Sequence, residues 1–304
     1  MVLSTLQSHW VATDQQKIRK WLSAPDPSSN HYDAVKKRGP ETGLWLISGE
    51  LLRNWKMSPH SFAWLYGIRM SSLYKIPSVT NNCKQLVAES RFYGQLTVVD
   101  RYLQKSKLIQ PFSSTVIEEV ENHCKEILTS HWHISTSILP IPSNRKPPSS
   151  FDLFLTQLSF QLPVCPDVLL KLHAACQGGS QQASTADLMK ALKSIIGNFR
   201  HVYFVIDALD ECTDQEELFT VLTEIADWKL HNSHVLATSR RERYIEERLA
   251  QIVTSHRNLD SDLVDEDIRC YLRTTLENDL RFKIWTREEQ QEIQGTVMER
   301  ANGV

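Results

Sequence analysis

One stretch near the middle of the chain constrains the fold more than any other: residues 201–206 read His-Val-Tyr-Phe-Val-Ile. A continuous run of β-branched and aromatic residues is typical of a strand that is buried on both faces, as central strands of parallel sheets are. A capping box at residues 213–216 opens a predicted helix to Leu230, and a second predicted strand spans residues 234–238. Strand, helix and strand in this order form a βαβ unit, so we predict an α/β fold with a parallel sheet.

The rest of the chain supplies more elements of the same kind. An apolar run at residues 62–68 predicts another buried strand. Helical periodicity and caps predict helices over residues 14–22, 113–128, 151–162, 166–176, 185–196, 265–276 and 290–301. We therefore divide the chain into a helical lead-in and linker (1–40), an α/β domain flanked by helices (41–250) and the start of a helical lid (251–304), which we expect to be truncated.

Charge and apolar runs restrict the partners. With 34 Lys and Arg against 36 Asp and Glu, the formal net charge is −2, so no global positive field attracts nucleic acid or an anionic membrane. No apolar run reaches the 18 or more residues of a membrane span, and the first 22 residues are too polar for a signal peptide. The six cysteines are scattered without a C-x-x-C pair, which favours reduced, buried thiols. We expect a cytoplasmic protein that binds neither nucleic acid nor membrane.

Three carboxylates gather where the first strand of the βαβ unit ends. Asp207, Asp210 and Glu211 follow the apolar run directly, at the edge where α/β sheets bind ligands. In one interpretation Asp207 holds Mg²⁺ and Asp210 or Glu211 orients an attacking water. In the other, the acids belong to a solvated loop and to a helix N-terminus, whose dipole favours them. The stretch alone does not decide between the two.

The second strand ends in Thr238, Ser239, Arg240 and Arg241. In an NTPase this edge is the place for a residue that senses the γ-phosphate. The alternative for the two arginines is surface pairing with Glu242, Glu246 or Glu247. Acids after one strand and Thr-Ser-Arg after the next are more informative together than either is alone.

The two strand ends together resemble the Walker B and sensor-1 strands of NACHT-type P-loop NTPases. The residues that carry the resemblance are 205–212, VIDALDEC, and 235–242, VLATSRRE. The likeness is strongest to the nephrocystin-type N-terminal domains of fungal NOD-like (STAND) receptors. Residues 21–27, 42–45, 62–68 and 264–269 also resemble segments of that family, in the family's order.

This resemblance implies a function and a set of roles. A domain of this family is a signal-transduction NTPase that binds ATP or GTP with Mg²⁺ and switches to a homo-oligomer. Carried over to this chain, Asp207 would be the Mg²⁺ ligand, and Asp210 and Glu211 the catalytic carboxylates. Thr238, Ser239 and Arg240 would contact the nucleotide.

The sequence departs from the family at the phosphate loop. The strand at 62–68 should lead into G-x-x-x-x-G-K-[ST], whose backbone N–H groups and lysine hold the phosphates. None of the ten glycines is followed by lysine, and no two of them stand five apart. Without this cradle the contacts to the β- and γ-phosphates are lost and only the Walker B carboxylates remain, so we expect weak or absent ATP binding.

Two segments are atypical. Residues 69–112 stand where the loop should be and carry a net charge of +5, against −7 for the remainder of the chain. We interpret them as a retained intron or a misplaced exon boundary; the alternative is a true lineage insertion. Residues 129–150 contain no acid, six serines and four prolines where the family has an aromatic-rich strand. We back-translated residues 132–140 with codons that we chose among the permitted ones. When the reading frame of that DNA is shifted by two bases, it encodes such a strand, which suggests a frame shift.

Three hypotheses of function follow. The first is a fragment of a NACHT-type signalling NTPase that is defective in nucleotide binding. The second is a non-catalytic scaffold, or a non-functional product of a faulty gene model. The third, a metal nuclease that uses Asp207, Asp210 and Glu211, lacks the basic groove that would hold nucleic acid.

Overall fold

The computed structural model describes residues 15–18, 20–22, 43–67, 115–120, 122–123, 132–138, 150–212, 214–259, 262–278, 282–283 and 285–302. The atypical segment 69–112 lies outside these residues, and so do most of the lead-in and linker and parts of 113–128 and 129–150. The two hypotheses about the origin of the atypical segments stay predictions.

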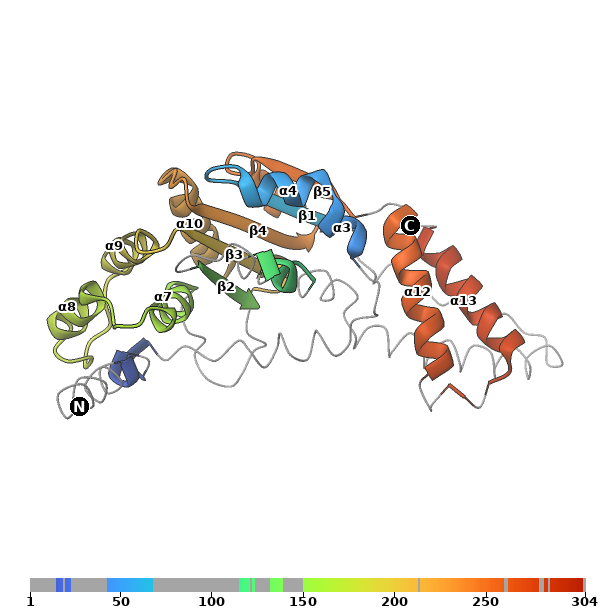
Figure 1. Ribbon diagram of the computed structural model, residues 1–304, viewed down its shortest axis with the longest axis horizontal. Coiled ribbons are helices and arrows are strands. Elements are labelled where there is room, and N and C mark those ends of the chain that lie inside the picture. The colour runs from blue at the N-terminus through green and yellow to red at the C-terminus, as the bar shows by residue number, and fades with distance from the viewer. Residues whose placement is uncertain are drawn as a thin grey trace.

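The described strands form one five-stranded sheet in the order β2-β3-β4-β1-β5, in which every neighbouring pair is parallel (Figure 1). The sheet confirms the predicted α/β fold and its βαβ unit. Its strands are β1 (Phe62–Gly67), β2 (Trp132–Ile138), β3 (His201–Asp207), β4 (Ser233–Arg240) and β5 (Ser255–Asn258). The three with long apolar runs, β1, β3 and β4, occupy the centre.

Helices cover both faces of the sheet, which explains why the central strands are apolar without alternation. On one face Phe204 and Ile206 of β3 belong to a core cluster with side chains from α7, α9 and α10. On the other face Tyr203 and Val205 of the same strand join side chains from α4 and from the helical residues 115–120. The helices of this part are α3 (Leu44–Ser48), α4 (Glu50–Met57), α7 (Ser150–Gln161), α8 (Asp167–Ala175), α9 (Thr185–Ile196), α10 (Gln215–Asp227) and α11 (Arg243–Leu249).

The caps show why several helices begin where they do. Ser184 accepts a hydrogen bond from the backbone N–H of Asp187 at the start of α9. For α10 the cap is Asp214, which accepts from Glu217, so the predicted capping box was placed one residue too early. In the lead-in, Ile18, Trp21 and Leu22 are buried in the same core cluster as α7 and α9.

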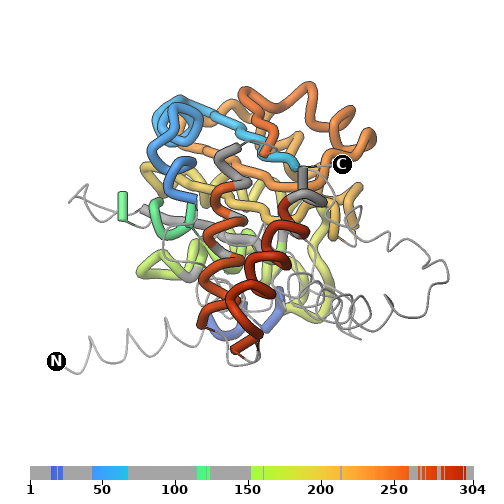
Figure 2. Tube along the Cα trace, turned by 90° about the vertical axis from the view of Figure 1, so that its right-hand side faces the viewer, coloured from blue at the N-terminus to red at the C-terminus, as the bar shows by residue number. Residues whose placement is uncertain are grey.

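Two further helices, α12 (Asp262–Asn278) and α13 (Arg287–Asn302), follow the sheet. The predicted capping box of α13 is confirmed, because Thr286 and Glu289 each accept a hydrogen bond from the other's backbone N–H. The two helices run side by side and project from one end of the α/β part (Figures 1 and 2). Both helices fall within residues 251–304, and the interpretation of this range as the start of a lid stays a prediction.

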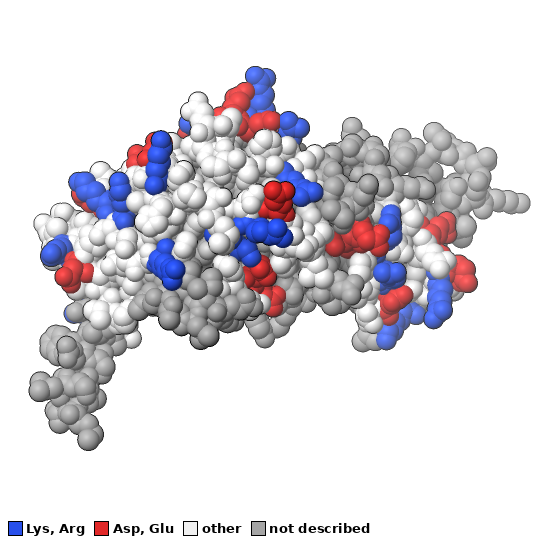
Figure 3. Space-filling view, turned by 45° about the horizontal axis from the view of Figure 1, so that its top comes forward, with Lys and Arg blue, Asp and Glu red and all other residues white. Residues whose placement is uncertain are grey.

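The surface carries charges of both signs. On the face shown in Figure 3, Lys and Arg side chains are interspersed with Asp and Glu side chains rather than gathered by sign. No helix in the described part of the chain is both long enough and apolar enough to cross a membrane.

Candidate functional site

The strand order places a switch point between β1 and β4. These strands are neighbours, with Gly67 opposite Arg240 at their carboxyl ends. After β1 the chain continues to β2, which is the strand at one edge of the sheet. After β4 it continues to β5, which is the strand at the opposite edge, so the two connections run in opposite directions. Open α/β sheets bind ligands at the carboxyl ends of strands beside such a point. The topology therefore selects the ends of β1, β3 and β4 as the candidate site.

Thr238 joins the ends of β3 and β4 through its hydroxyl group. The hydroxyl donates to Asp207 Oδ1 at 2.6 Å and accepts from the backbone N–H of Ala208 at 3.0 Å. Thr238 is fully buried and Asp207 is almost fully buried. The hydroxyl of Thr238 thus fixes the orientation of the carboxylate that the resemblance assigns to Mg²⁺.

Ala208 makes the turn that follows Asp207. Its φ of 52° and ψ of 54° lie in the left-handed region, which costs a non-glycine residue about 1–2 kcal/mol. The 3-10 turn η2 (Leu209–Glu211) follows at once and brings Asp210 back toward the end of β4. The bond from the Ala208 N–H to Thr238 holds this turn in place.

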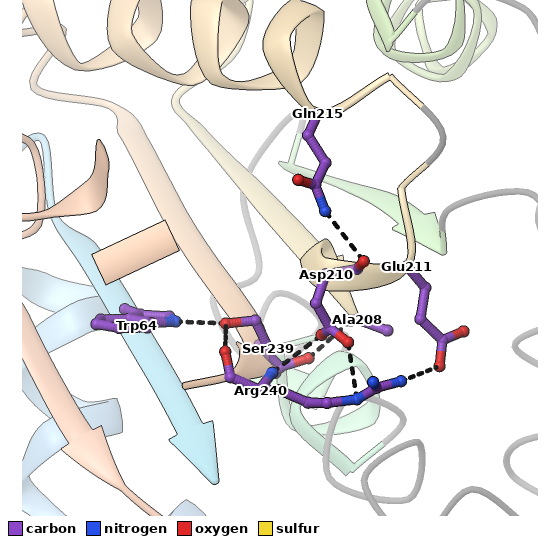
Figure 4. Close-up of polar contacts among 8 residues, drawn as sticks. Trp64, Ala208, Asp210, Glu211, Gln215, Ser239 and Arg240 are labelled. Atoms are coloured by element: carbon purple, nitrogen blue, oxygen red, sulfur yellow. Dashed lines mark hydrogen bonds and ion pairs between the residues drawn. The ribbon is translucent and has the colours of Figure 1, made fainter. Parts of the chain in front are cut away.

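Asp210 and Arg240 form a closed pair beside the turn (Figure 4). Asp210 Oδ1 accepts from the backbone N–H of Arg240 at 2.9 Å, and Oδ2 lies 3.0 Å from its Nε. Glu211 Oε1 lies 3.6 Å from Nη2 of the same guanidinium group. Gln215, the first residue of α10, donates to the carbonyl of Asp210 at 3.0 Å. The expected phosphate sensor is therefore already paired with one of the expected catalytic carboxylates, Asp210, and lies near the other, Glu211.

The side chain of Ser239 is buried. Its hydroxyl accepts from the indole N–H of Trp64 at 2.9 Å and donates to the carbonyl of Arg240 at 2.8 Å (Figure 4). Arg241, two positions after Ser239, donates to Glu246 at 2.8 Å and lies over the Tyr66 ring. The alternative of surface pairing is thus confirmed for Arg241, whereas Arg240 pairs with the acids after β3.

All six residues that the sequence selected gather at one edge of the sheet. Within the described ranges, no group of three or more His, Cys, Asp or Glu side chains is arranged to hold a metal ion. Sequence reasoning missed Trp64, Ala208 and Gln215. Trp64 resembled an ordinary core residue and Gln215 an ordinary helix residue, so no sequence signal connected either of them to this site.

A second buried polar network lies at the opposite, amino-terminal edge of the same strands. The Ser61 hydroxyl donates to the carbonyl of Trp55 at 2.5 Å, so it accepts from His234 Nδ1 at 2.8 Å. His234 Nε2 is then the acceptor for His201 Nδ1, also at 2.8 Å. Burial, and then the neighbouring His201, lower the pKa of His234 from 6.5 to about 4. Burial also lowers the pKa of His201.

The fold and the site define an α/β domain with a polar edge at a switch point of its sheet. Residues 111–240 match the family model described as nephrocystin 3, N-terminal. The match includes β3 and β4 and so contains all six candidate residues. It begins at the end of the atypical segment 69–112. No curated protein and no solved structure matches the chain.

Proposed function

We propose that the chain is a fragment of a NACHT-type, STAND-class signalling NTPase that has lost most of its affinity for nucleotide. The observation that carries the proposal is that Asp207, which Thr238 holds, and the Asp210–Arg240 pair lie at the carboxyl ends of β3 and β4, beside the switch point of a parallel sheet. The similarity of residues 111–240 to the nephrocystin 3 N-terminal family supports it. In this class of protein the domain switches to an oligomer when nucleotide binds, so a chain that no longer binds nucleotide would have lost this cytoplasmic switch.

The described residues fit Mg²⁺ with ATP or GTP only in part. Asp207, Asp210 and Glu211 offer carboxylate oxygens, which are the ligands that Mg²⁺ prefers. A triphosphate also needs positive charge, and in the part of the chain that the structure describes the two arginines at the carboxyl end of β4 are already engaged, Arg240 with Asp210 and Arg241 with Glu246. The phosphate-loop motif is missing from the sequence as well. The site as built therefore favours weak binding.

Isothermal titration of the purified chain with Mg²⁺ and ATP, and separately with GTP, tests this proposal. We expect no binding in the micromolar range, because the sequence has no phosphate-loop motif and, among the described residues, Arg240 and Arg241 at this edge are already paired with carboxylates. Thermal unfolding in the same mixtures should show no shift, since a ligand at 100 times its Kd would add about 2.7 kcal/mol of stability. Micromolar affinity that disappears in Asp207→Ala would contradict the proposed loss of binding.

The closed pair of Asp210 and Arg240 favours a second candidate, a non-catalytic scaffold. In a scaffold these residues only stabilise the fold, so Asp210→Ala would lower stability and leave the chain without response to any nucleotide. A weak NTPase fragment would instead show millimolar binding that depends on Asp207. Sequencing of the transcript across codons 60–160 would further show whether residues 69–112 exist in the cell.

A further inference from the structure

Two segments that resemble the family take no part in the candidate site, yet they meet in the structure. Oδ2 of Asp267, on α12, accepts a hydrogen bond from the backbone N–H of Gly43 at 2.8 Å. The same oxygen accepts from the indole Nε1–H of Trp45, on α3, at 2.9 Å. One carboxylate oxygen thus links the segment before the sheet to the first helix after it, more than 220 positions away in the sequence.

The backbone of Gly43 is fixed in the conformation that makes this contact. Its φ of 82° is left-handed, and a Cβ at this position would lie 3.2 Å from Thr115 Cγ2. Its carbonyl accepts from the N–H groups of Leu46 and Ile47, at 3.1 and 3.3 Å, and so begins α3. The left-handed backbone angle therefore favours glycine, and any larger residue would also push Thr115 aside.

The surroundings hold the carboxylate and the indole together. Asp267 is half-buried, and this burial raises its pKa, while the bonds from Gly43 and Trp45 act in the opposite direction. The guanidinium group of Arg257, on β5, lies 5.4 Å from the centre of the Trp45 ring. The contact therefore lies beside the end of β5, close to where α12 begins.

The helical pair α12–α13 buries apolar side chains that lie outside the two core clusters of the α/β part. Leu272, Leu276, Phe282 and Ile293 are all buried. None of these four side chains belongs to either of the two core clusters that the described residues of the α/β part form. In Figure 1 the pair lies at one end of the sheet rather than over either of its faces. Gln290 and Gln294 of α13 donate hydrogen bonds to backbone carbonyls of α12 and so link the two helices, and the Asp267 carboxylate joins the pair to α3.

We propose that Asp267 is a lock that holds the α12–α13 pair against α3, and that opening its two hydrogen bonds releases the pair as a unit. The α/β part keeps its fold when the lock opens, because its core clusters do not depend on the pair. Because both hydrogen bonds end on one carboxylate oxygen, another donor that takes this oxygen from Gly43 and Trp45 opens the lock. This role is independent of nucleotide binding and stands even if the proposed function fails.

Hydrogen–deuterium exchange followed by mass spectrometry tests the lock in Asp267→Ala. We expect exchange in residues 44–48 to rise about tenfold, since two hydrogen bonds to a carboxylate are lost. Exchange in β3 and in α13 should stay as in the parent chain, and the radius of gyration from small-angle scattering should increase. The matched control is Glu266→Ala, which removes the neighbouring carboxylate, an ion-pair partner of Arg269 within α12, and should change nothing. Unchanged exchange in 44–48, or loss of protection in α13, would overturn the lock.

A milder variant covers the case in which Asp267→Ala unfolds the whole chain. Trp45→Phe removes the indole donor but keeps an aromatic ring beneath Arg257. We expect exchange in residues 44–48 to rise about threefold, with β3 still protected, because one bond of the two remains. A change that spreads to β3, or no change at all, would count against the proposal.

Discussion

The two ends of the β3–β4 pair both bury polar networks, but the two networks have opposite chemistry. At the carboxyl end, the charged groups of Asp210 and Arg240 neutralise each other. At the amino end, neutral groups form a chain from His201 through His234 and Ser61 to a backbone carbonyl of α4. The first network depends on opposite charges being present, and the second depends on charge being absent.

The difference shows which end suits a ligand. The side chain of Arg240 is 31% exposed, so its guanidinium group reaches solvent at the carboxyl end. His234 is completely buried and stacks on the ring of Tyr203. A phosphate or a cation can approach the first network and exchange partners with it, whereas it cannot reach the central histidine of the second.

Removal of Asp210 should give the largest effect, because it leaves the Arg240 guanidinium group and its backbone N–H without their carboxylate partner. We expect Asp210→Ala to lower the free energy of unfolding by about 3 kcal/mol, at the lower end for a broken buried pair because Arg240 still reaches water. The measurement is urea unfolding. Glu211→Ala is the matched control: its side chain is 40% exposed, and its loss should cost under about 1 kcal/mol. Equal losses in the two variants would show that the carboxyl end is an ordinary surface ion pair.

Thr238→Val should have the next largest effect. The substitution keeps the shape of the side chain but removes the hydroxyl that donates to Asp207 and accepts from Ala208. A buried carboxylate loses a donor and a strained turn loses its bond, so we expect a cost of about 2 kcal/mol. Thr220→Val, on the exposed face of α10, should cost much less. A similar cost at both sites would mean that Thr238 does not position the carboxylate.

Thr238 also shows where sequence reasoning succeeds and where it stops. The strand at 201–206 and the capping box at Thr286 were predictable, because their signals lie within a few neighbouring residues. The gathering of the six candidate residues was predictable from the sheet alone, since parallel strands share a carboxyl edge. The burial of the Thr238 and Ser239 hydroxyls was not, because their partners lie 31 and 175 residues away.

The edge strand β5 shows the same limit in the fold. It reads Ser-His-Arg-Asn and has no buried residue, so its pairing with β1 rests on backbone hydrogen bonds. Neither an apolar run nor β-branched residues mark such a strand in the sequence. The contact of Asp267 with Gly43 and Trp45 could not be predicted either. The resemblance to the family gave the order of the two segments along the chain but not their contact in space.

Acid should weaken the amino end selectively. The pKa of His234 is about 4 in the folded chain and 6.5 in the unfolded chain, so the unfolded state binds more protons between these values. The stability that depends on neutral His234 is present above pH 6.5 and is lost as the pH falls. We expect His234 alone to cost about 1.3 kcal/mol between pH 7.5 and pH 5.5. Urea unfolding of the parent chain and of His234→Gln across this range gives the difference; parallel pH profiles would contradict a neutral buried histidine.

Ser61→Ala should give the smallest effect, and its size tests whether the amino end tolerates the loss of one link. The Ser61 hydroxyl connects His234 to the carbonyl of Trp55. Because the carbonyls of Trp55 and Ser58 also face the His234 ring, the imidazole N–H retains acceptors after the substitution. We therefore expect a loss of about 1 kcal/mol in urea unfolding, with His234 still neutral at pH 7. A loss as large as that of Asp210→Ala would mean that the neutral network is as intolerant of a missing partner as the charged one, and the contrast between the two ends would fail.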